Sequence, residues 1–135
     1  MRTFAIGILH TTGSENIEAV TSFVGEDATG SFGILAGHAR MMTTLVIGLA
    51  RFRSHGDTWH YLALPGALLY FHDELLTLST RRFLLDDDYT RISEELHQQL
   101  LVEEQQLHAM KESLHRMEEE ILKRLWSIGR GITEV

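Results

Sequence analysis

Two Glu-x-x-His repeats come nearer to known metal chemistry than any other residues of this sequence. Glu94 precedes His97 by three positions, and Glu112 precedes His115 by the same interval. On a helix this spacing places a carboxylate and an imidazole on one face, as in di-iron carboxylate bundles. Such a site needs four helices, whereas the segment that holds both repeats has room for at most two. A solvated, charged helix face is the favoured interpretation, and we predict no metal site.

No other arrangement of reactive side chains indicates catalysis. The sequence has no phosphate-binding glycine loop, no nucleophile elbow and no triad-like motif. No serine, cysteine or carboxylate motif accompanies His38, and the absence of cysteine excludes thiolate ligands and disulfides. Trp59 and Trp126 are interpreted as packing residues or interface anchors. We therefore expect a non-catalytic protein that works by binding.

Charge is distributed unevenly along the 135 residues, whose net charge is −7. Residues 1–85 hold six basic and seven acidic side chains, a net of −1, and residues 86–135 hold six and twelve, a net of −6. The acidic C-terminal part argues against nucleic acid and against anionic membrane surfaces as partners. No apolar run is long enough to cross a bilayer, so we expect no direct lipid insertion. Basic protein surfaces remain as partners.

Glycine separates two regions of the chain. Nine of the eleven glycines lie between Gly7 and Gly66, and neither glycine nor proline occurs from Ala67 to Ile128. Turns are therefore expected throughout the first region and are not signalled in the second. We predict an α+β protein with two domains, a β-rich domain over residues 1–85 and a helical arm over residues 86–135.

Seven β-branched, aromatic or leucine-rich runs predict strands in the first region. They are Thr3–Leu9, Ala19–Val24, Phe32–Leu35, Thr44–Phe52, Trp59–Leu64, Ala67–Phe71 and Leu75–Thr80. Clusters of turn residues separate them, and the Ser54-His55-Gly56-Asp57 cluster is typical of a hairpin tip. Short strands at this spacing favour a sandwich or a small barrel.

The arm opens on three aspartates, Asp86–Asp88, which suit the N-cap and first turn of a helix. We predict helix to about Ile128, with Gly129 and Gly131 as stop signals. Steps of three and four define an apolar stripe, called the seam below, which comprises Leu107, Met110, Leu114, Met117, Ile121 and Leu125 and continues to Ile128. A second stripe of Ile92, Leu96 and Leu100 precedes it. Glu103 and Glu104 interrupt the pattern, which is compatible with a turn between two antiparallel helices or with one long helix.

The segment of residues 30–45, GSFGILAGHARMMTTL, is the most informative in the sequence. It resembles the G-x-x-G-I-L-P-G-H-A-P-L-L-T-x-L signature of the epsilon subunit of F-type ATP synthases. Residues 23–26, 61–68 and 75–78 also resemble strands of that family, in the same order along the chain. Ala36 and Arg40 stand where the family usually has proline, which indicates a divergent branch.

The resemblance implies a sandwich of about ten short strands followed by an antiparallel helical hairpin, or by one long helix. It implies a non-catalytic rotor subunit of an ion-translocating ATP synthase, which links the gamma subunit to the ring of c subunits. The ring-facing loop would comprise Gly37, His38, Ala39, Arg40 and Met41. The helices would reach the alpha and beta subunits when extended and restrain ATP hydrolysis. The complex would hold the chain at the cytoplasmic face of the bacterial inner membrane.

Some members of that family bind ATP through a motif resembling (I/L)-D-x-x-R-A at the start of the helices. Asp88 and Arg91 match its acidic and basic positions, whereas the flanking apolar residue and alanine are missing. The alternative is that Asp88 only caps the helix and Arg91 is solvated. We predict no obligatory cofactor, with ATP as a candidate regulatory ligand.

Two further classes of function stay open at this point. One is a free-standing β-sandwich that binds a ligand and dimerises through its helical arm. The other is a metal-dependent enzyme built on a helical bundle. The epsilon-subunit hypothesis is the leading one, because the loop motif and the order of the strands agree over nearly the whole chain.

Overall fold

The computed structural model describes residues 2–56 and 58–133, with residues 130–133 described as backbone only. The chain forms two compact units, Met1–Leu101 and Val102–Val135. All strands and the first two helical segments belong to the first unit. The second unit is a single helix.

Ten strands and three helical segments occur in the described residues. The strands are β1 (Phe4–His10), β2 (Gly13–Val20), β3 (Ser22–Asp27), β4 (Gly30–Leu35), β5 (Met41–Leu45), β6 (Gly48–Arg53), β7 (Trp59–Leu64), β8 (Ala67–His72), β9 (Leu75–Ser79) and β10 (Leu84–Asp86). The helical segments are α1 (Tyr89–Glu95), the π-helix η1 (Leu96–Leu101) and α2 (Val102–Thr133). The mostly-β first part and helical second part confirm the predicted fold class.

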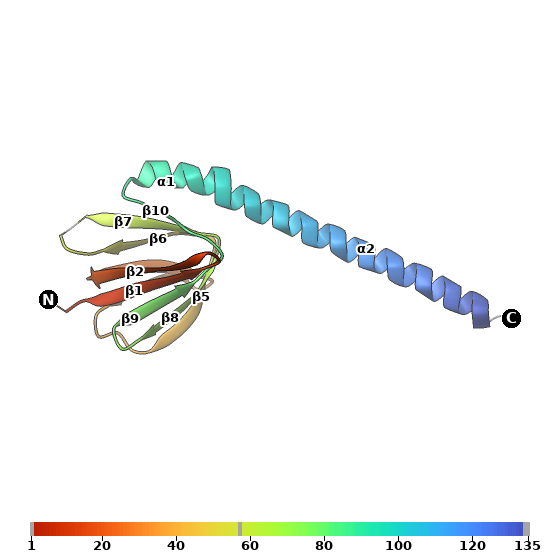
Figure 1. The fold of residues 1–135 in the computed structure, drawn as a ribbon, viewed down its shortest axis with the longest axis horizontal. Helices are drawn as coiled ribbons and strands as arrows, with labels where there is room; N and C mark the ends of the chain where they lie inside the picture. Colours follow the sequence, from red (N-terminus) through yellow and green to blue (C-terminus); the bar gives the residue numbers. More distant parts are fainter. Residues whose placement is uncertain (1, 57, 134–135) are drawn as a thin grey trace. The chain divides into compact units, whose positions relative to one another are not determined.

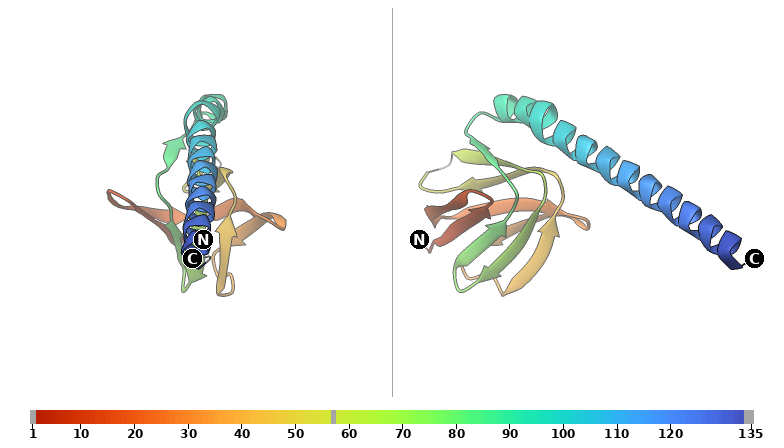
Figure 2. Two further views of the ribbon diagram at one scale, coloured as in Figure 1. Left: turned by 90° about the vertical axis from the view of Figure 1, so that its right-hand side faces the viewer. Right: turned by 45° about the vertical axis from the view of Figure 1, so that its right-hand side comes forward.

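The strands make one curled sheet in the order β10-β7-β6-β3-β5-β8-β9-β1-β2, with β4 paired to β3. Neighbours are antiparallel except β1 and β9, which are parallel. The register between β3 and β5 consists of one pair, Asp27 with Leu45. The sheet curls at this short junction, so that β6 and β7 face β1, β8 and β9 across a common core (Figures 1 and 2). The result is the predicted sandwich.

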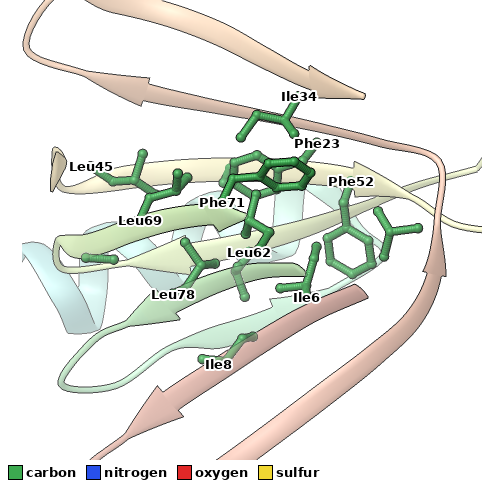
Figure 3. Close-up of a cluster of buried hydrophobic side chains, with 14 of the residues drawn as sticks. Ile6, Ile8, Phe23, Ile34, Leu45, Phe52, Leu62, Leu69, Phe71 and Leu78 are labelled. Atoms are coloured by element: carbon green, nitrogen blue, oxygen red, sulfur yellow. The ribbon is translucent and has the colours of Figure 1, made fainter. Parts of the chain in front are cut away.

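The core of the sandwich is apolar and almost closed to solvent. Alternate residues of each strand point into it, as the period of two requires. Figure 3 shows Ile6 and Ile8 of β1 together with the rings of Phe52 and Phe71. Ile6, Ile8, Phe23, Leu62, Leu69 and Leu78 are completely buried. Each such side chain contributes about 1.5–3 kcal/mol before entropic costs, so this core holds the sandwich together.

The predicted strands agree with the structure over much of the sheet, and they differ in one central boundary and at the sheet edges. The run Thr44–Phe52 is two strands, since β5 ends at Leu45 and β6 begins at Gly48. Most of β2 was not predicted, because it is an edge strand whose residues are largely exposed and lack an apolar alternation. The three-residue β10 was also missed. The Ser54–Asp57 turn does connect β6 and β7, although Asp57 itself lies outside the described residues.

A second, smaller apolar cluster covers the outer side of β7. Ile92 of α1 and Leu100 of η1 are fully buried against Ala63, and Leu96 is partly buried beside them. Both faces of β7 are therefore covered, which explains why Leu62, Ala63 and Leu64 are all buried. The stripe of Ile92, Leu96 and Leu100 thus packs α1 and η1 onto the sandwich.

Helical backbone continues from Tyr89 to Thr133 without an intervening turn. Of the two predicted alternatives, the structure has the single helical run and not the hairpin. Glu103 and Glu104 lie in the first turn of α2, where acidic side chains favour the helix dipole. Gly129 does not end α2, because an isolated glycine weakens a helix by about 1 kcal/mol without preventing it. The predicted domain boundary at residue 86 stays a prediction, since β10 ends there but the compact unit extends to Leu101.

Candidate functional site

The loop between β4 and β5 requires glycine at position 37. Gly37 has a φ of +83°, which side-chain-bearing residues rarely adopt. A Cβ atom there would lie 2.9 Å from Nη1 of Arg2. The Gly37 amide donates a hydrogen bond to the carboxylate of Glu74, in the turn between β8 and β9. The loop is thus hydrogen-bonded to a neighbouring turn and lies against the Arg2 side chain.

The other predicted loop residues also have defined contacts. The His38 amide donates to the Leu35 carbonyl at 3.1 Å, and its ring packs edge-on against Phe71 with centroids 5.9 Å apart. Ala39 is exposed and its carbonyl oxygen lies 2.7 Å from Nδ1 of His38. The guanidinium carbon of Arg40 lies 5.5 Å from the centre of the Tyr70 ring. Met41 packs against the main core. These contacts make the loop an ordered surface and give His38 a packing role.

An apolar outer face adjoins this loop on β5, β8 and β9. Met42, Leu68 and Leu75 are 62%, 45% and 45% exposed. They point outward because the next residue along each strand points the other way, as Leu69 and Leu76 do into the core. We call Met42, Leu68, Tyr70 and Leu75 the apolar face. Exposed apolar groups that gather on one face are typical of a protein interface.

Each of the three aspartates before the helix has a separate partner. Asp86, the last residue of β10, accepts two hydrogen bonds from the guanidinium of Arg91, at 2.5 Å and 2.6 Å. Asp87 pairs with Nδ1 of His60 on β7. Asp88 is the N-cap of α1 and accepts from the Arg91 amide at 3.2 Å, which confirms the predicted cap. We call the Asp86–Arg91 pair the clasp.

The clasp is charge-assisted and bidentate, the strong form of such a pair. The hydrogen bonds from the Arg91 side chain, followed by the one from the Asp88 amide, hold the pKa of Asp86 well below its usual range. The same contact with Asp86 raises the pKa of Arg91. Sequence reasoning selected Asp88 and Arg91 but missed Asp86 as the partner of Arg91. The available signal was a carboxylate five residues before the arginine, in the run of aspartates that precedes the helix.

The seam lies on α2 and is largely uncovered. Met110, Leu114, Met117, Ile121 and Leu125 are between 54% and 60% exposed, and Leu107 is half-buried. Histidine–glutamate pairs within α2 lie elsewhere on its surface. Nε2 of His108 lies 3.1 Å from Oε1 of Glu112, and Nε2 of His115 lies 3.1 Å from Oε1 of Glu119. Such pairs stabilise a helix by roughly 0.2–0.5 kcal/mol each. The role of the seam stays a prediction.

The two Glu-x-x-His repeats do not converge. Glu112 pairs with His108 and not with His115. Within residues 2–56 and 58–133, no three His, Asp or Glu side chains gather as a metal site would require. In the same ranges no helix combines the length and apolar character needed to cross a bilayer.

Comparison with protein families gives a match over most of the sandwich. The family described as ATP synthase, Delta/Epsilon chain, beta-sandwich domain matches residues 3–85. Among curated proteins, the chain is 34% identical over 83 residues to ATP synthase epsilon chain 2 of Cereibacter sphaeroides, which covers 61% of this chain and 57% of that protein. It is 29% identical over 82 residues to ATP synthase epsilon chain 2 of Paraburkholderia xenovorans, covering 60% and 59%. The chain thus spans less than two thirds of the length of these relatives.

Solved structures with the same fold come from mitochondrial ATP synthases. A chain in the Tetrahymena thermophila central stalk and c-ring structure has a TM-score of 0.50 and 10% identity, covering 62% of this chain and 66% of that one. A chain in the Euglena gracilis OSCP/F1/c-ring structure in rotational state 1 has a TM-score of 0.53 and 16% identity, covering 69% and 61%. At these identities the likeness supports the fold alone.

Proposed function

This chain belongs to the delta/epsilon family of ATP synthase chains, and from that membership we propose that it is an epsilon subunit of an F-type ATP synthase. In this proposal it is a non-catalytic part of the central-stalk rotor, where it links the gamma subunit to the ring of c subunits. The assembled motor would hold it at the cytoplasmic face of a bacterial inner membrane. The observation that carries the proposal is the family match over residues 3–85, which spans nearly all of the sandwich.

We assign the sandwich to the contact with the rotor. The loop of residues 37–41 has an ordered backbone and presents Ala39 and Arg40 to solvent. The apolar face lies on the strand that follows this loop and on its neighbours β8 and β9. Two adjoining surfaces, one polar and one apolar, suit a subunit that touches two partners. We propose that the loop contacts the c ring and that the apolar face contacts gamma.

We assign α2 to regulation. Its seam has the spacing of a coiled-coil stripe and is exposed, so a helix of gamma or a groove between alpha and beta could cover it. Covering the seam in one state of the motor and not in another would restrain ATP hydrolysis in the first state only. Such a switch needs two states that differ by only a few kcal/mol.

We propose that Asp88 and Arg91 serve the fold and do not bind ATP. The Asp88 carboxylate caps α1, and two donors of the Arg91 side chain are bound to Asp86. A nucleotide phosphate would have to displace Asp86 from Arg91. Calorimetric titration of the full chain with ATP is expected to give no binding heat. A saturable heat that disappears in Arg91→Gln would overturn this assignment.

Co-purification tests the rotor assignment. An affinity tag on this chain should recover the gamma subunit and the c ring in stoichiometric amounts from gently solubilised membranes. Met42→Glu on the apolar face should reduce the recovery, whereas Glu18→Gln on the edge strand β2 should not. A chain that is recovered alone, or as a dimer of itself, would contradict the assignment and favour a free-standing module with a helical dimerisation arm.

Charged substitutions in the seam test the regulatory assignment. Leu114→Glu and Ile121→Glu place charge on the seam and should raise the ATP hydrolysis rate of the assembled motor if the seam restrains it. Lys111→Glu changes charge on α2 outside the seam and is the matched control. Equal hydrolysis rates for all variants, with normal assembly, would remove the seam from regulation.

A further inference from the structure

Two arginines and a tryptophan form a cluster on the outer side of β6 and β7. Arg51 and Arg53 are alternate residues of β6, so they point to the same side of the sheet. Between them Phe52 is buried in the core, which places both arginines outward. Arg53 pairs across the strands with Trp59, and Arg51 pairs with Tyr61. We call Arg51, Arg53 and Trp59 the arginine ridge.

Both guanidinium groups contact the indole ring of Trp59. The guanidinium carbons of Arg51 and Arg53 each lie 4.4 Å from the ring centroid. A guanidinium stacked on an aromatic ring keeps the N–H groups at its edge free to donate. Among the described residues, neither guanidinium forms an ion pair with a carboxylate. The ridge therefore presents two oriented cations that pair with no carboxylate in the part of the chain that the structure describes, in a protein whose net charge is −7.

A hollow lies on either side of the ridge. The first, of about 510 Å³, is lined by Arg53 together with Arg2 and His55, and by Thr21, Ser54, Gly56, Leu35 and Ala36. Within residues 2–56 and 58–133, no acidic residue lines this hollow, although Glu74 lies 3.7 Å from the guanidinium of Arg2. The second hollow, of about 340 Å³, is lined by Arg51, Tyr61 and Tyr89, with Glu26 as the acidic residue. Among the described residues around the two hollows, positive charge is thus concentrated on the ridge and in the first hollow.

We propose that the arginine ridge binds an acidic segment of a partner protein. Arg51 and Arg53 extend from the same side of β6, so one acidic segment can present a carboxylate to each of them, from residues i and i+2 of a strand or i and i+4 of a helix. One carboxylate binds Arg53 at the mouth of the first hollow, and the other binds Arg51. The inference rests on the proposed function in one respect, because the partner would be another subunit of the motor.

The composition of the ridge favours a polypeptide over a small anion. Tryptophan and arginine are the residue types that most often dominate binding energy at protein interfaces. Leu35, at the rim of the first hollow, is 63% exposed and offers an apolar contact that a phosphate or a free carboxylate would not use. A polypeptide lying across the ridge would cover Leu35 and reach both arginines at once.

Binding to the motor's own subunits provides the first test. The full chain is titrated against a purified complex of gamma and the c ring that lacks this subunit, at salt concentrations from low to high. Arg51→Gln with Arg53→Gln is expected to weaken binding at least tenfold at low salt and to flatten its dependence on salt. Replacing both arginines by lysine should give an intermediate loss, because charge is kept while bidentate donation is lost. Arg116→Gln with Lys123→Gln removes the same charge from α2 outside the seam and should have little effect.

A second probe separates failure of the ridge from failure of the rotor assignment. Poly-L-glutamate should bind the parent chain in a salt-sensitive manner and bind the Arg51→Gln, Arg53→Gln chain much more weakly, whether or not gamma and the c ring bind. Equal binding of poly-L-glutamate by the two chains would overturn the inference. It would also be overturned if phosphatidylglycerol vesicles, and not poly-L-glutamate, required the two arginines, since the ligand would then be a lipid phosphate. Unchanged melting temperatures for both variants would establish that folding is intact.

Discussion

The two parts of the helical run, residues 89–101 and α2, carry similar apolar stripes, but the first stripe is buried and the second is exposed. Ile92 and Leu100 are completely buried against β7, whereas Leu114 and Ile121 of α2 are 56% and 54% exposed. Residue type does not explain this difference, since isoleucine and leucine at helical spacing occur in both stripes, and the seam adds only methionine. A periodic apolar pattern therefore specifies a face of a helix, but it does not specify what covers that face.

The two parts also differ in how their backbone is held. α1 begins at a side-chain cap and carries the Asp86–Arg91 clasp, and Tyr89 packs edge-on against Tyr61 with centroids 5.4 Å apart. α2 is supported by pairs within the helix such as His108 with Glu112. Because isolated helices are marginal in water, α2 gains most from a partner that covers its seam. The five predictions that follow test this difference, beginning with the largest expected effect.

Leu100→Ala should destabilise the chain far more than Leu114→Ala. Leu100 is fully buried, so its truncation is expected to cost about 2–5 kcal/mol through lost burial and a residual cavity. Leu114 is exposed, and its replacement should change the free energy of unfolding by about 0.5 kcal/mol or less. Urea unfolding of both variants measures the difference. Equal losses would mean that the seam is packed in the free chain.

Breaking the clasp should loosen α1 while leaving α2 unaffected. In Arg91→Gln, hydrogen exchange of the amides in α1 should accelerate, because Asp86 loses its two charge-assisted bonds. Amides in α2 serve as the internal control. Faster exchange confined to α2 would contradict the prediction, because it would mean that the clasp supports α2 and not α1.

The clasp also predicts a dependence on pH. The pKa of Asp86 is lowered in the folded state, so the clasp stabilises the fold fully above the unfolded pKa of about 3.9 and is lost as pH falls below it. The free energy of unfolding of the parent chain should therefore decrease below about pH 4. In Asp86→Asn this decrease should be smaller, because the clasp is already absent at neutral pH. Urea unfolding at a series of pH values measures both. Identical acid profiles would argue against the clasp.

Removing residues 102–135 should affect the first unit little. The main core and the cluster on β7 both lie within Met1–Leu101. We expect the unfolding free energy of the shortened chain to stay within about 1 kcal/mol of the parent, in the range of surface contacts. Denaturation followed by tryptophan fluorescence of Trp59 measures it. A loss of several kcal/mol would show that α2 stabilises the sandwich.

Gly129→Ala should have the smallest effect, and only on α2. A Cβ atom at this position meets no atom within 4 Å. Alanine favours helix over glycine by about 0.8–1.0 kcal/mol, so the far-ultraviolet signal of helix should increase slightly. The unfolding midpoint of the sandwich should not move, and a shift in that midpoint would indicate that the end of α2 is coupled to it.

Much of this fold could be predicted from the sequence because its local signals are strong. The Asp88 cap, the glycine loop before Met41 and the seam are all specified by residues close together in the chain. β2 was missed because an exposed edge strand needs no apolar alternation. Whether Glu103 and Glu104 mark a turn could not be decided, since acidic residues suit the first turn of a helix as well as a loop.

The candidate sites were less accessible to sequence reasoning, because their residues meet only through the fold. Arg51 and Trp59 are brought together by the β6–β7 register, and Gly37 meets Glu74 across the loops. The sequence pattern predicts Asp86 at the start of the helix, whereas in the structure it is the last residue of β10 and binds Arg91 from that strand. Pair contacts of this kind depend on strand register, which no local pattern encodes.

The parallel pairing of β1 with β9 has a consequence for synthesis of the chain. Residues of β1 reach their final neighbour only when Leu75–Ser79 has been made, some seventy residues later. Until then the nascent chain exposes Ile6 and Ile8, even if β1 and β2 have already formed a hairpin. Long-range pairing of this kind slows folding and leaves the early chain prone to aggregation. The sandwich is therefore expected to close after translation of most of the chain, with β1 among the last strands to be enclosed.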